Sequence, residues 1–242
     1  MDIKIIYEDN DVLAVDKPAG VVVFCEASAE ASAKAGHVYL IDELTKKYPE
    51  LKNVGEGPRY GIVHRIDKDT SGVLLVAKNN ESLTFLQKQF QPLEKGAEKR
   101  YIALVEGNVE QDSGTIHTLI ARAKGDPRKQ RAYSTINAPK SAREAITEYK
   151  VLERYKDYTL LEVQIKTGRR HQIRCHFSYL KHPIAGDKMY GFKNSKTPNG
   201  LTRQFLHATY LRIKLPNGEI KLFESKLPEE LRDVIKNLKF KI

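Results

Sequence analysis

Short runs of alternating hydrophobic and polar residues recur along the chain and predict β-strands. The alternation places apolar side chains on one face of a strand, because successive side chains point to opposite sides. Residues 73–77 are apolar throughout, so we expect this strand to be buried on both faces. The predicted strands cover residues 3–7, 12–15, 21–24, 73–77, 101–105, 147–152, 158–166, 205–215 and 220–223.

Apolar residues spaced three or four apart predict four helices, because that spacing forms one stripe along a helix. The first helix ends before Pro49, and Asn80 is the predicted N-cap of the second. Gly168 is expected to let the chain turn from a strand into the third helix, and Pro228 opens the fourth. Residues 121–143, rich in Lys, Arg, Pro and Gly, are predicted to form a loop. The apolar stripes run through residues 38–48, 83–90, 173–180 and 231–238.

The predicted strands outnumber the helices, and hairpin-like connections join many of them. Strands and long helices do not alternate regularly, which argues against a doubly wound parallel sheet. No repeat of 20–50 residues and no linker divides the chain. We therefore predict one α+β domain over residues 1–242, with a predominantly antiparallel or mixed sheet, flanking helices, and two lobes around a cleft.

The chain is strongly basic. It has 242 residues, with 41 Lys and Arg against 31 Asp and Glu, and a formal net charge of +10. An excess of this size favours encounters with phosphate backbones, which makes nucleic acid a candidate partner. An enzyme of small anions, or a charge that serves only solubility, fits the same composition.

Two cysteines, Cys25 and Cys175, could form one disulfide on paper, but nothing else indicates an oxidising compartment. The N-terminal residues are too polar to open a signal peptide. No apolar run approaches the ~20 residues of a membrane span. The sequence therefore predicts a cytoplasmic protein that does not bind a membrane.

Residues 64–72 read His-Arg-Ile-Asp-Lys-Asp-Thr-Ser-Gly and place a carboxylate among cations before a sharp turn. Neighbouring cations favour the ionised form of a carboxylate, which suits Asp67 to act as a nucleophile or a base. Alternatively, Asp67 bonds its own backbone within the turn, although Asp69 lies closer to Gly72 and fits that part better. From these residues alone, both interpretations of Asp67 stay open.

Two further segments carry candidate chemistry. Tyr101 lies in the run K-R-Y-I-A-L-V-E-G, where packing within a sheet is the default interpretation. Residues 167–176, T-G-R-R-H-Q-I-R-C-H, lead into a predicted helix, and their basic residues lie where the helix dipole favours anions. A metal site built from His171, Cys175 and His176 is not expected, because their spacing fits no zinc motif and His176 lies about 100° away on an ideal helix.

Several segments resemble, in the same order, the motifs of the RluA-type pseudouridine synthases, which isomerise uridine within RNA. Residues 64–67 are similar to the family's H-R-L-D motif, and residues 99–107 to its K-x-Y-x-A-x-V-x-G motif. Residues 167–176 resemble its T-G-R-T-H-Q-I-R-V-H segment. Further similar segments are 6–20, 182–191, 206–208 and 227–228. The resemblance spans nearly the whole chain.

This resemblance implies the pseudouridine synthase fold and activity, with no cofactor, metal or energy source. It implies that Asp67 acts on the ribose, either by attack at C1′ or by removal of a ribose proton. Arg174 would pair with Asp67, and Tyr101 would pack on the target base. Arg65 would support the extrusion of the uridine from folded RNA. Arg170 replaces the family's usual Thr or Ser and adds a cation at the mouth of the site.

The expected RNA-binding residues are His64, Arg65, Arg169, Arg170 and His171 near the site, and Lys124, Arg128, Lys129 and Arg131, together with Arg122, in the basic loop. The chain begins almost directly with the family's opening, so we expect a monomer without an S4-like RNA-binding module at its N-terminus. Large-subunit ribosomal RNA is the favoured substrate, and transfer RNA stays open. An RNA-binding or ribosome-assembly protein without catalysis is the alternative of a different class. A hydrolase using His64 and Asp67 would lack a Ser or Cys nucleophile in a strand-to-helix elbow.

Overall fold

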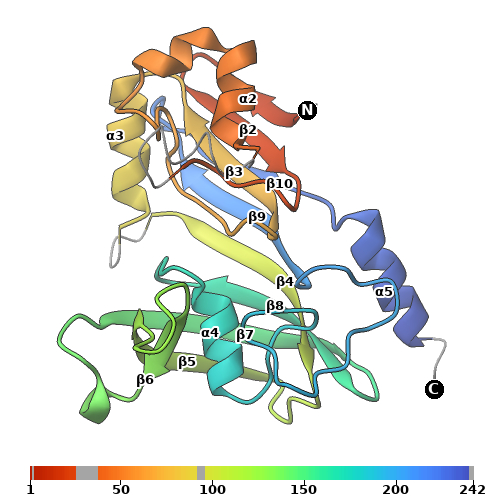
Figure 1. Cartoon of the computed structure of the whole chain (residues 1–242). Helices are drawn as coiled ribbons and strands as arrows, with labels where there is room; N and C mark the ends of the chain where they lie inside the picture. The colour runs from red at the N-terminus through yellow and green to blue at the C-terminus, as the bar shows by residue number, and fades with distance from the viewer. Residues whose placement is uncertain (2, 26–37, 92–95, 240–242) are drawn as a thin grey trace. The chain divides into compact units, whose positions relative to one another are not determined.

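The computed structural model describes residues 1, 3–25, 38–91 and 96–239, and the chain divides into two compact units (Figure 1). Unit 1 comprises Met1–Glu98 and Ala208–Lys226, and unit 2 comprises Lys99–His207 and Leu227–Ile242. Each unit combines antiparallel strand pairs with a few helices, which confirms the predicted α+β class. The expected cleft between two lobes stays a prediction.

Unit 1 is built on a sheet in the order β1-β2-β3-β9, with β10 also paired to β9. Its strands are β1 (Lys4–Glu8), β2 (Val12–Lys17), β3 (Ser71–Ala77), β9 (Leu206–Lys214, in unit 1 from Ala208 onward) and β10 (Ile220–Glu224). The pairs β1–β2, β2–β3 and β9–β10 are antiparallel. Every residue of β3 is buried, as its unbroken apolar run predicts.

The helices of unit 1 are α2 (Leu40–Lys47), the short 3₁₀ helix η1 (Pro49–Asn53) and α3 (Asn80–Gln89). The N-cap of α3 is Asn79 rather than the predicted Asn80, because the Asn79 side chain accepts a 2.8 Å hydrogen bond from the N–H of Ser82. The Asn80 side chain instead accepts from the N–H of Gly55 at 2.6 Å and so fixes the preceding loop.

The strand predicted at residues 21–24 is absent. Val22 forms only an isolated bridge to Tyr39, although Val21, Val23 and Phe24 are all buried. Adjacent residues of a regular strand point to opposite faces, whereas this segment buries neighbours in irregular backbone. The hydrophobic run therefore indicated burial correctly and strand geometry wrongly.

Unit 2 is built on five antiparallel strands in the order β4-β8-β7-β5-β6. The strands are β4 (Glu98–Glu106, in unit 2 from Lys99 onward), β5 (Ser113–Arg122), β6 (Gln130–Tyr133), β7 (Arg143–Arg154) and β8 (Tyr158–Ile165). The helices are α4 (Gln172–Tyr179), α5 (Glu229–Lys239) and the 3₁₀ turn η2 (Thr135–Asn137). In α5, Leu231 and Val234 are buried, as their spacing predicts.

Two strands of unit 2, β5 and β6, were not predicted from the hydrophobic pattern of the sequence. Along β5, the core face carries Ile116, Thr118 and Ile120, so a buried threonine interrupts the hydrophobic alternation. The strand β6 lies inside the segment predicted to be a loop and buries only Ala132. Its pairing with β5 follows from tertiary structure, because one buried residue leaves no recognisable period.

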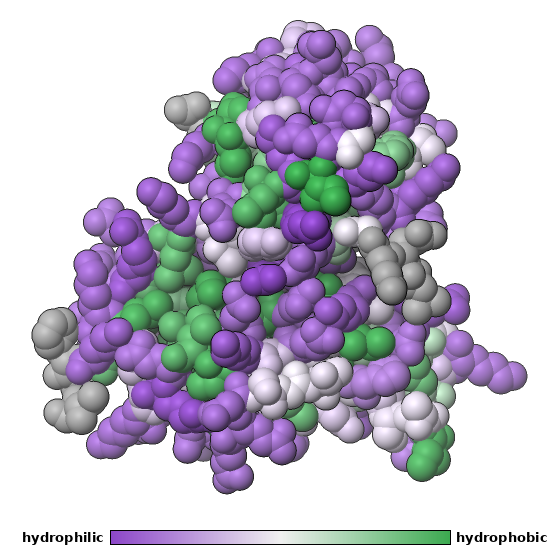
Figure 2. Space-filling view, turned by 180° about the vertical axis from the view of Figure 1, so that it is seen from behind, coloured by the Kyte–Doolittle hydropathy of each residue, from purple (hydrophilic) through white to green (hydrophobic). Residues whose placement is uncertain are grey.

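Hydrophilic residues cover most of the face seen in Figure 2, with smaller hydrophobic patches among them. Within the described ranges, no helix combines the length and the apolarity needed to cross a bilayer.

Candidate functional site

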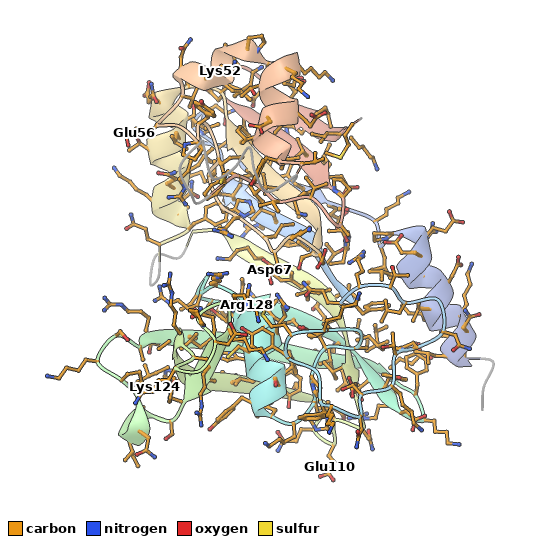
Figure 3. All side chains as sticks on the ribbon, in the orientation of Figure 1. Lys52, Glu56, Asp67, Glu110, Lys124 and Arg128 are labelled. Atoms are coloured by element: carbon orange, nitrogen blue, oxygen red, sulfur yellow. The ribbon has the colours of Figure 1, made fainter. Side chains whose placement is uncertain are left out.

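Asp67 lies in unit 1, in the loop just before β3 (Figure 3). Its backbone carbonyl accepts the N–H of Thr70 at 3.1 Å, which closes the turn. Ile66 on one side and Thr70 on the other are buried, whereas Asp67 is partly exposed and Asp69 is exposed. Buried neighbours thus anchor the loop on both sides of the partly exposed Asp67.

Lys17, at the end of β2, fixes the same loop from the interior of unit 1. Its side chain is fully buried, and its Nζ donates to the carbonyls of Pro18 and Val21 at 2.8 Å and of Lys68 at 2.9 Å. The N–H of Gly20 donates to the Lys68 carbonyl as well, at 2.9 Å. The turn after β2 therefore holds the backbone directly beyond Asp67. The sequence contained this signal, because a lysine next to Pro-Ala-Gly stands outside the apolar pattern.

Gly72 lets β3 begin against the strand β9. Its φ is +120°, and a Cβ on this residue would lie 2.1 Å from the carbonyl oxygen of Ala208. No side chain fits at that distance, so any substitution would force the two strands apart. The Thr-Ser-Gly end of the motif thereby sets where the Asp67 loop joins the sheet.

His64 anchors the start of the motif. Its Nε2 accepts the N–H of Leu75 at 3.1 Å, and its ring stacks on Phe90 with centroids 4.4 Å apart. A ring nitrogen that accepts a hydrogen bond carries no proton, so this contact fits a neutral imidazole. The geometry favours a structural part for His64, and its contact with RNA stays a prediction.

Arg65 is exposed, and its guanidinium carbon lies 5.3 Å from the centroid of the Phe24 ring. Arg59 lies over the same ring at 4.8 Å. Phe24 is buried, and its ring lies within cation–π distance of both guanidinium groups. The sequence pattern gave no indication of this aromatic support beneath Arg65.

The segment 167–176 lies in unit 2, and its turn into α4 is made differently from the prediction. The residue with left-handed backbone is His171, with φ 54°, and not Gly168, where an added Cβ would meet nothing within 4 Å. The Gln172 side-chain oxygen accepts from the hydroxyl of Thr167 at 2.8 Å and from the N–H of Arg169 at 3.0 Å. These bonds fold the basic residues back over the start of the helix.

Arg174 in α4 forms a buried ion pair with Asp187. Its Nε donates to Oδ2 of Asp187 at 2.6 Å, and its Nη2 donates to Oδ1 at 3.0 Å. Burial by itself raises the pKa of Asp187, but the hydrogen bond and charge of Arg174 hold that pKa below its usual range. Both charges therefore persist inside the protein.

The Tyr190 side chain contacts Arg174 and also residues at the start of β6 and at the start of α4. The Arg174 guanidinium lies 5.0 Å from the centroid of the Tyr190 ring. The Tyr190 hydroxyl accepts the N–H of Gln130 at 2.7 Å and lies 2.9 Å from Nδ1 of His171. The start of β6, the start of α4 and the loop that carries Asp187 thus meet at one aromatic side chain.

Tyr101 lies in β4, opposite Val163 of β8, and is buried. Lys99, two residues earlier on the same face, is also buried, and burial lowers its pKa to about 8. A buried lysine beside Tyr101 is a further titratable group that the sequence pattern did not single out.

Among the described residues, no cluster of three or more His, Cys, Asp or Glu side chains has the geometry of a metal site. His176 is buried between two threonines, with Nδ1 2.8 Å from the hydroxyl of Thr147 and Nε2 2.9 Å from that of Thr118. Burial lowers its pKa to about 4, so it is neutral at physiological pH. Cys25 and Cys175 are both free thiols, and the disulfide considered from the sequence does not form.

The basic loop connects β5 to β6 in unit 2 and carries Lys124 and Arg128 (Figure 3). Arg128 is exposed and binds Asp126 through Nε and Nη2, each at 2.9 Å. Lys124 is exposed as well, whereas Arg131, predicted to lie in the loop, belongs to β6 and lies over the ring of Tyr133 at 5.4 Å. The loop therefore presents cations to solvent, although one of them already has an acidic partner.

The predicted site residues divide between the two units. Unit 1 brings Asp67 together with His64 and Arg65, and unit 2 holds Tyr101, Arg174 and the basic residues of 169–171 and the loop. The predicted pairing of Arg174 with Asp67 joins the two units and stays a prediction.

Comparison with known proteins agrees with these motifs. The family model of RNA pseudouridylate synthases matches residues 11–179. The chain is 40% identical, over 99% of its length, to an uncharacterised RNA pseudouridine synthase of Bacillus subtilis, of which it covers 74%. It is 37% identical, over 98% of its length, to ribosomal large subunit pseudouridine synthase D of Nitrosomonas europaea, of which it covers 65%. The corresponding protein of Pseudomonas aeruginosa is 36% identical over 95% of this chain, which covers 70% of it.

The fold is shared with a human structure, RNA pseudouridylate synthase domain containing 1. The TM-score is 0.72, the match covers 98% of this chain and 95% of that one, and the sequences are 24% identical. The family model matches most of the chain, and the relatives are 36–40% identical to it. Together these two findings assign the chain to a family. This chain belongs to the RluA-type RNA pseudouridylate synthase family and is an RNA pseudouridine synthase.

Proposed function

We propose that this enzyme converts specific uridines of large-subunit ribosomal RNA to pseudouridine. Two of the relatives described above are named ribosomal large subunit pseudouridine synthases. The net charge of +10 and the exposed cations of the basic loop suit a large polyanionic substrate. Transfer RNA is the competing substrate, and the experiment below separates the two.

The reaction breaks the N1–C1′ bond of uridine and forms a C5–C1′ bond. The C5 proton leaves the base and N1 gains one, so the overall change is an isomerisation. No electrons are gained or lost, and no other reactant is consumed. The protein must therefore extrude the nucleotide, act on the ribose and retain the freed base until it rejoins the sugar.

Asp67 is the proposed catalytic residue, and it acts on the ribose of the extruded uridine. The observation that carries this assignment is the anchoring of its loop by Lys17 and by the buried Ile66, which holds the partly exposed Asp67 in a fixed frame. A fixed frame suits a residue that must meet C1′ or a ribose proton in one geometry.

Three further residues have proposed parts. Arg174 pairs with Asp67 and keeps the carboxylate oriented, Tyr101 packs on the uracil, and Arg65 stacks in the space that the uridine leaves. Arg65 already rests on the aromatic face of Phe24, which supports a guanidinium that stacks on rings. Contacts of Arg169, Arg170 and the basic loop with phosphates would place the RNA without reading its sequence.

The test is pseudouridine mapping across total RNA from cells with and without the gene. Loss of one or more sites in large-subunit ribosomal RNA, restored by the wild-type gene but not by Asp67→Ala, is the expected result. Loss confined to transfer RNA would overturn the proposed substrate. An unchanged map would favour an RNA-binding protein without catalysis.

A further inference from the structure

We propose that Asp187 is a positioning residue of this enzyme, which holds the Nε/Nη2 edge of the Arg174 guanidinium so that the adjacent Nη1/Nη2 edge can bind a second carboxylate. The inference deepens the proposed function and rests on it, because Arg174 is there the partner of Asp67. It adds a residue from the loop at 182–191, whose part in the site the motifs left open.

The contact between Asp187 and Arg174 is side-on and bidentate. Nε and Nη2 of Arg174 each donate to a different oxygen of Asp187, at 2.6 and 3.0 Å. The Asp187 side chain has no exposed surface, and that of Arg174 has 9%. Because a guanidinium is planar and rigid, fixing its Nε/Nη2 edge also fixes the direction of its Nη1/Nη2 edge. A second carboxylate can take a bidentate contact only there.

Asp187 is itself held by the backbone around it. Its Oδ1 also accepts the N–H groups of Met189 at 2.9 Å and Tyr190 at 3.0 Å. Its own N–H donates to the carbonyl of Ile184 at 3.1 Å, and its carbonyl accepts the N–H of Gly191 at 2.9 Å. Two backbone N–H groups thus orient the carboxylate, and two further hydrogen bonds fix the backbone of Asp187 in the same tight loop, so the carboxylate orients the arginine rather than the reverse.

The Tyr190 ring restricts the same guanidinium from a second direction, since the cation lies over the ring at 5.0 Å. An edge contact from Asp187 and a face contact from Tyr190 leave the guanidinium little rotational freedom. Asp187 also balances the buried positive charge, which would otherwise be costly. If Asp187 were purely structural, its replacement would lower only the stability of the protein. If it positions Arg174, its replacement also slows isomerisation.

The experiment compares Asp187→Asn with a matched control, Glu230→Gln. Glu230 is the carboxylate partner of Arg203, whose side chain is 10% exposed and donates through Nη2 at 2.9 Å. Each variant thus removes the charge that faces a nearly buried arginine of unit 2. The substrate is large-subunit ribosomal RNA transcribed in vitro, and the measurements are single-turnover isomerisation, RNA affinity and Tm.

We expect Asp187→Asn to slow single-turnover isomerisation by about 100-fold, as a misdirected catalytic partner does, while RNA affinity changes by less than about threefold. Glu230→Gln should keep the wild-type rate within about twofold, and its Tm should fall less, because the Glu230 side chain is 50% exposed. Equal rate losses in the two variants would overturn the proposal. If Asp187→Asn does not fold, Asp187→Glu keeps the charge and lengthens the side chain, and a wild-type rate in that variant would also overturn it.

An NMR measurement separates this inference from the proposed function. In the wild-type protein, the Nε–H of Arg174 should give a signal that exchanges slowly with water, and Asp187→Asn should remove that protection. A protected signal in Asp187→Asn overturns the positioning role whatever the activity is. Absence of isomerisation by the wild-type enzyme on both ribosomal and transfer RNA overturns the proposed function, and it leaves the NMR test of the Asp187–Arg174 contact standing.

Discussion

The ammonium nitrogen of Lys17 lies 2.9 Å from the carbonyl oxygen of Lys68, the residue directly after Asp67. Lys17 is fully buried, and its ammonium group also donates to the carbonyls of Pro18 and Val21. These three carbonyl acceptors all belong to unit 1. A segment near the N-terminus thus fixes the backbone beside the proposed catalytic carboxylate.

Replacement of Lys17 by Met should lower both stability and activity. Methionine fills a similar volume but leaves buried carbonyl oxygens without donors, which we expect to cost about 3 kcal/mol in the free energy of unfolding. The loop at Asp67 would also lose its tether, so isomerisation should slow even where the protein is fully folded. Urea unfolding and single-turnover rates measure the two effects. Lys52→Met, at an exposed lysine of the same unit, is the control and should change neither.

Asp67→Ala should abolish isomerisation and leave RNA affinity largely intact. The carboxylate is the group proposed to act on the ribose, whereas affinity comes from cations that contact phosphates. Asp69→Ala provides the matched control, because Asp69 is an exposed aspartate of the same turn. Turnover of uridine by purified Asp67→Ala would refute the catalytic assignment, and so would equal losses in the two variants.

Acid should destabilise the protein through His176. Its pKa is about 4 in the folded protein, chiefly because of burial, against a usual value of 6.5. Between those two values the unfolded chain therefore binds one more proton than the folded protein. The stability contributed by the neutral His176 is complete above pH 6.5 and is lost as the pH falls toward 4. The loss amounts to about 3 kcal/mol over that window.

The measurement is the free energy of unfolding against pH for the wild type and His176→Gln. The glutamine variant should be less stable at neutral pH, because the bonds to Thr118 and Thr147 are disturbed, but its stability should depend less on pH between 4 and 6.5. Parallel curves for the two proteins would show that His176 does not carry this acid sensitivity.

The basic loop should contribute to RNA affinity through charge alone. Lys124→Ala should weaken binding and reduce the slope of log affinity against log salt by about 0.7–0.9, as the loss of one phosphate contact does. Arg128→Ala should have a smaller effect, because Asp126 already binds the Arg128 guanidinium. Lys52→Ala is the control outside the loop. Equal salt slopes for wild type and Lys124→Ala would exclude Lys124 from the RNA contact.

The hydrophobic pattern by itself determined most of the elements and the α+β class. Periods of two and of three to four depend only on which face of an element is buried, so β3 and α5 follow directly from their residues. The pattern failed where burial is irregular or sparse. Residues 21–24 are buried without forming a strand, and β6 pairs with β5 although it buries only Ala132.

The sequence motifs also nominated the chemical groups, among them Asp67, Tyr101 and Arg174. Only the tertiary structure showed which residues hold these groups in place. Lys17 bonds the backbone of the Asp67 loop, Phe24 packs on Arg65, and Asp187 forms an ion pair with Arg174. Lys17 and Lys68 are 51 positions apart in the chain. Contacts at such separations depend on how several elements pack at once, which no local spacing of residues encodes.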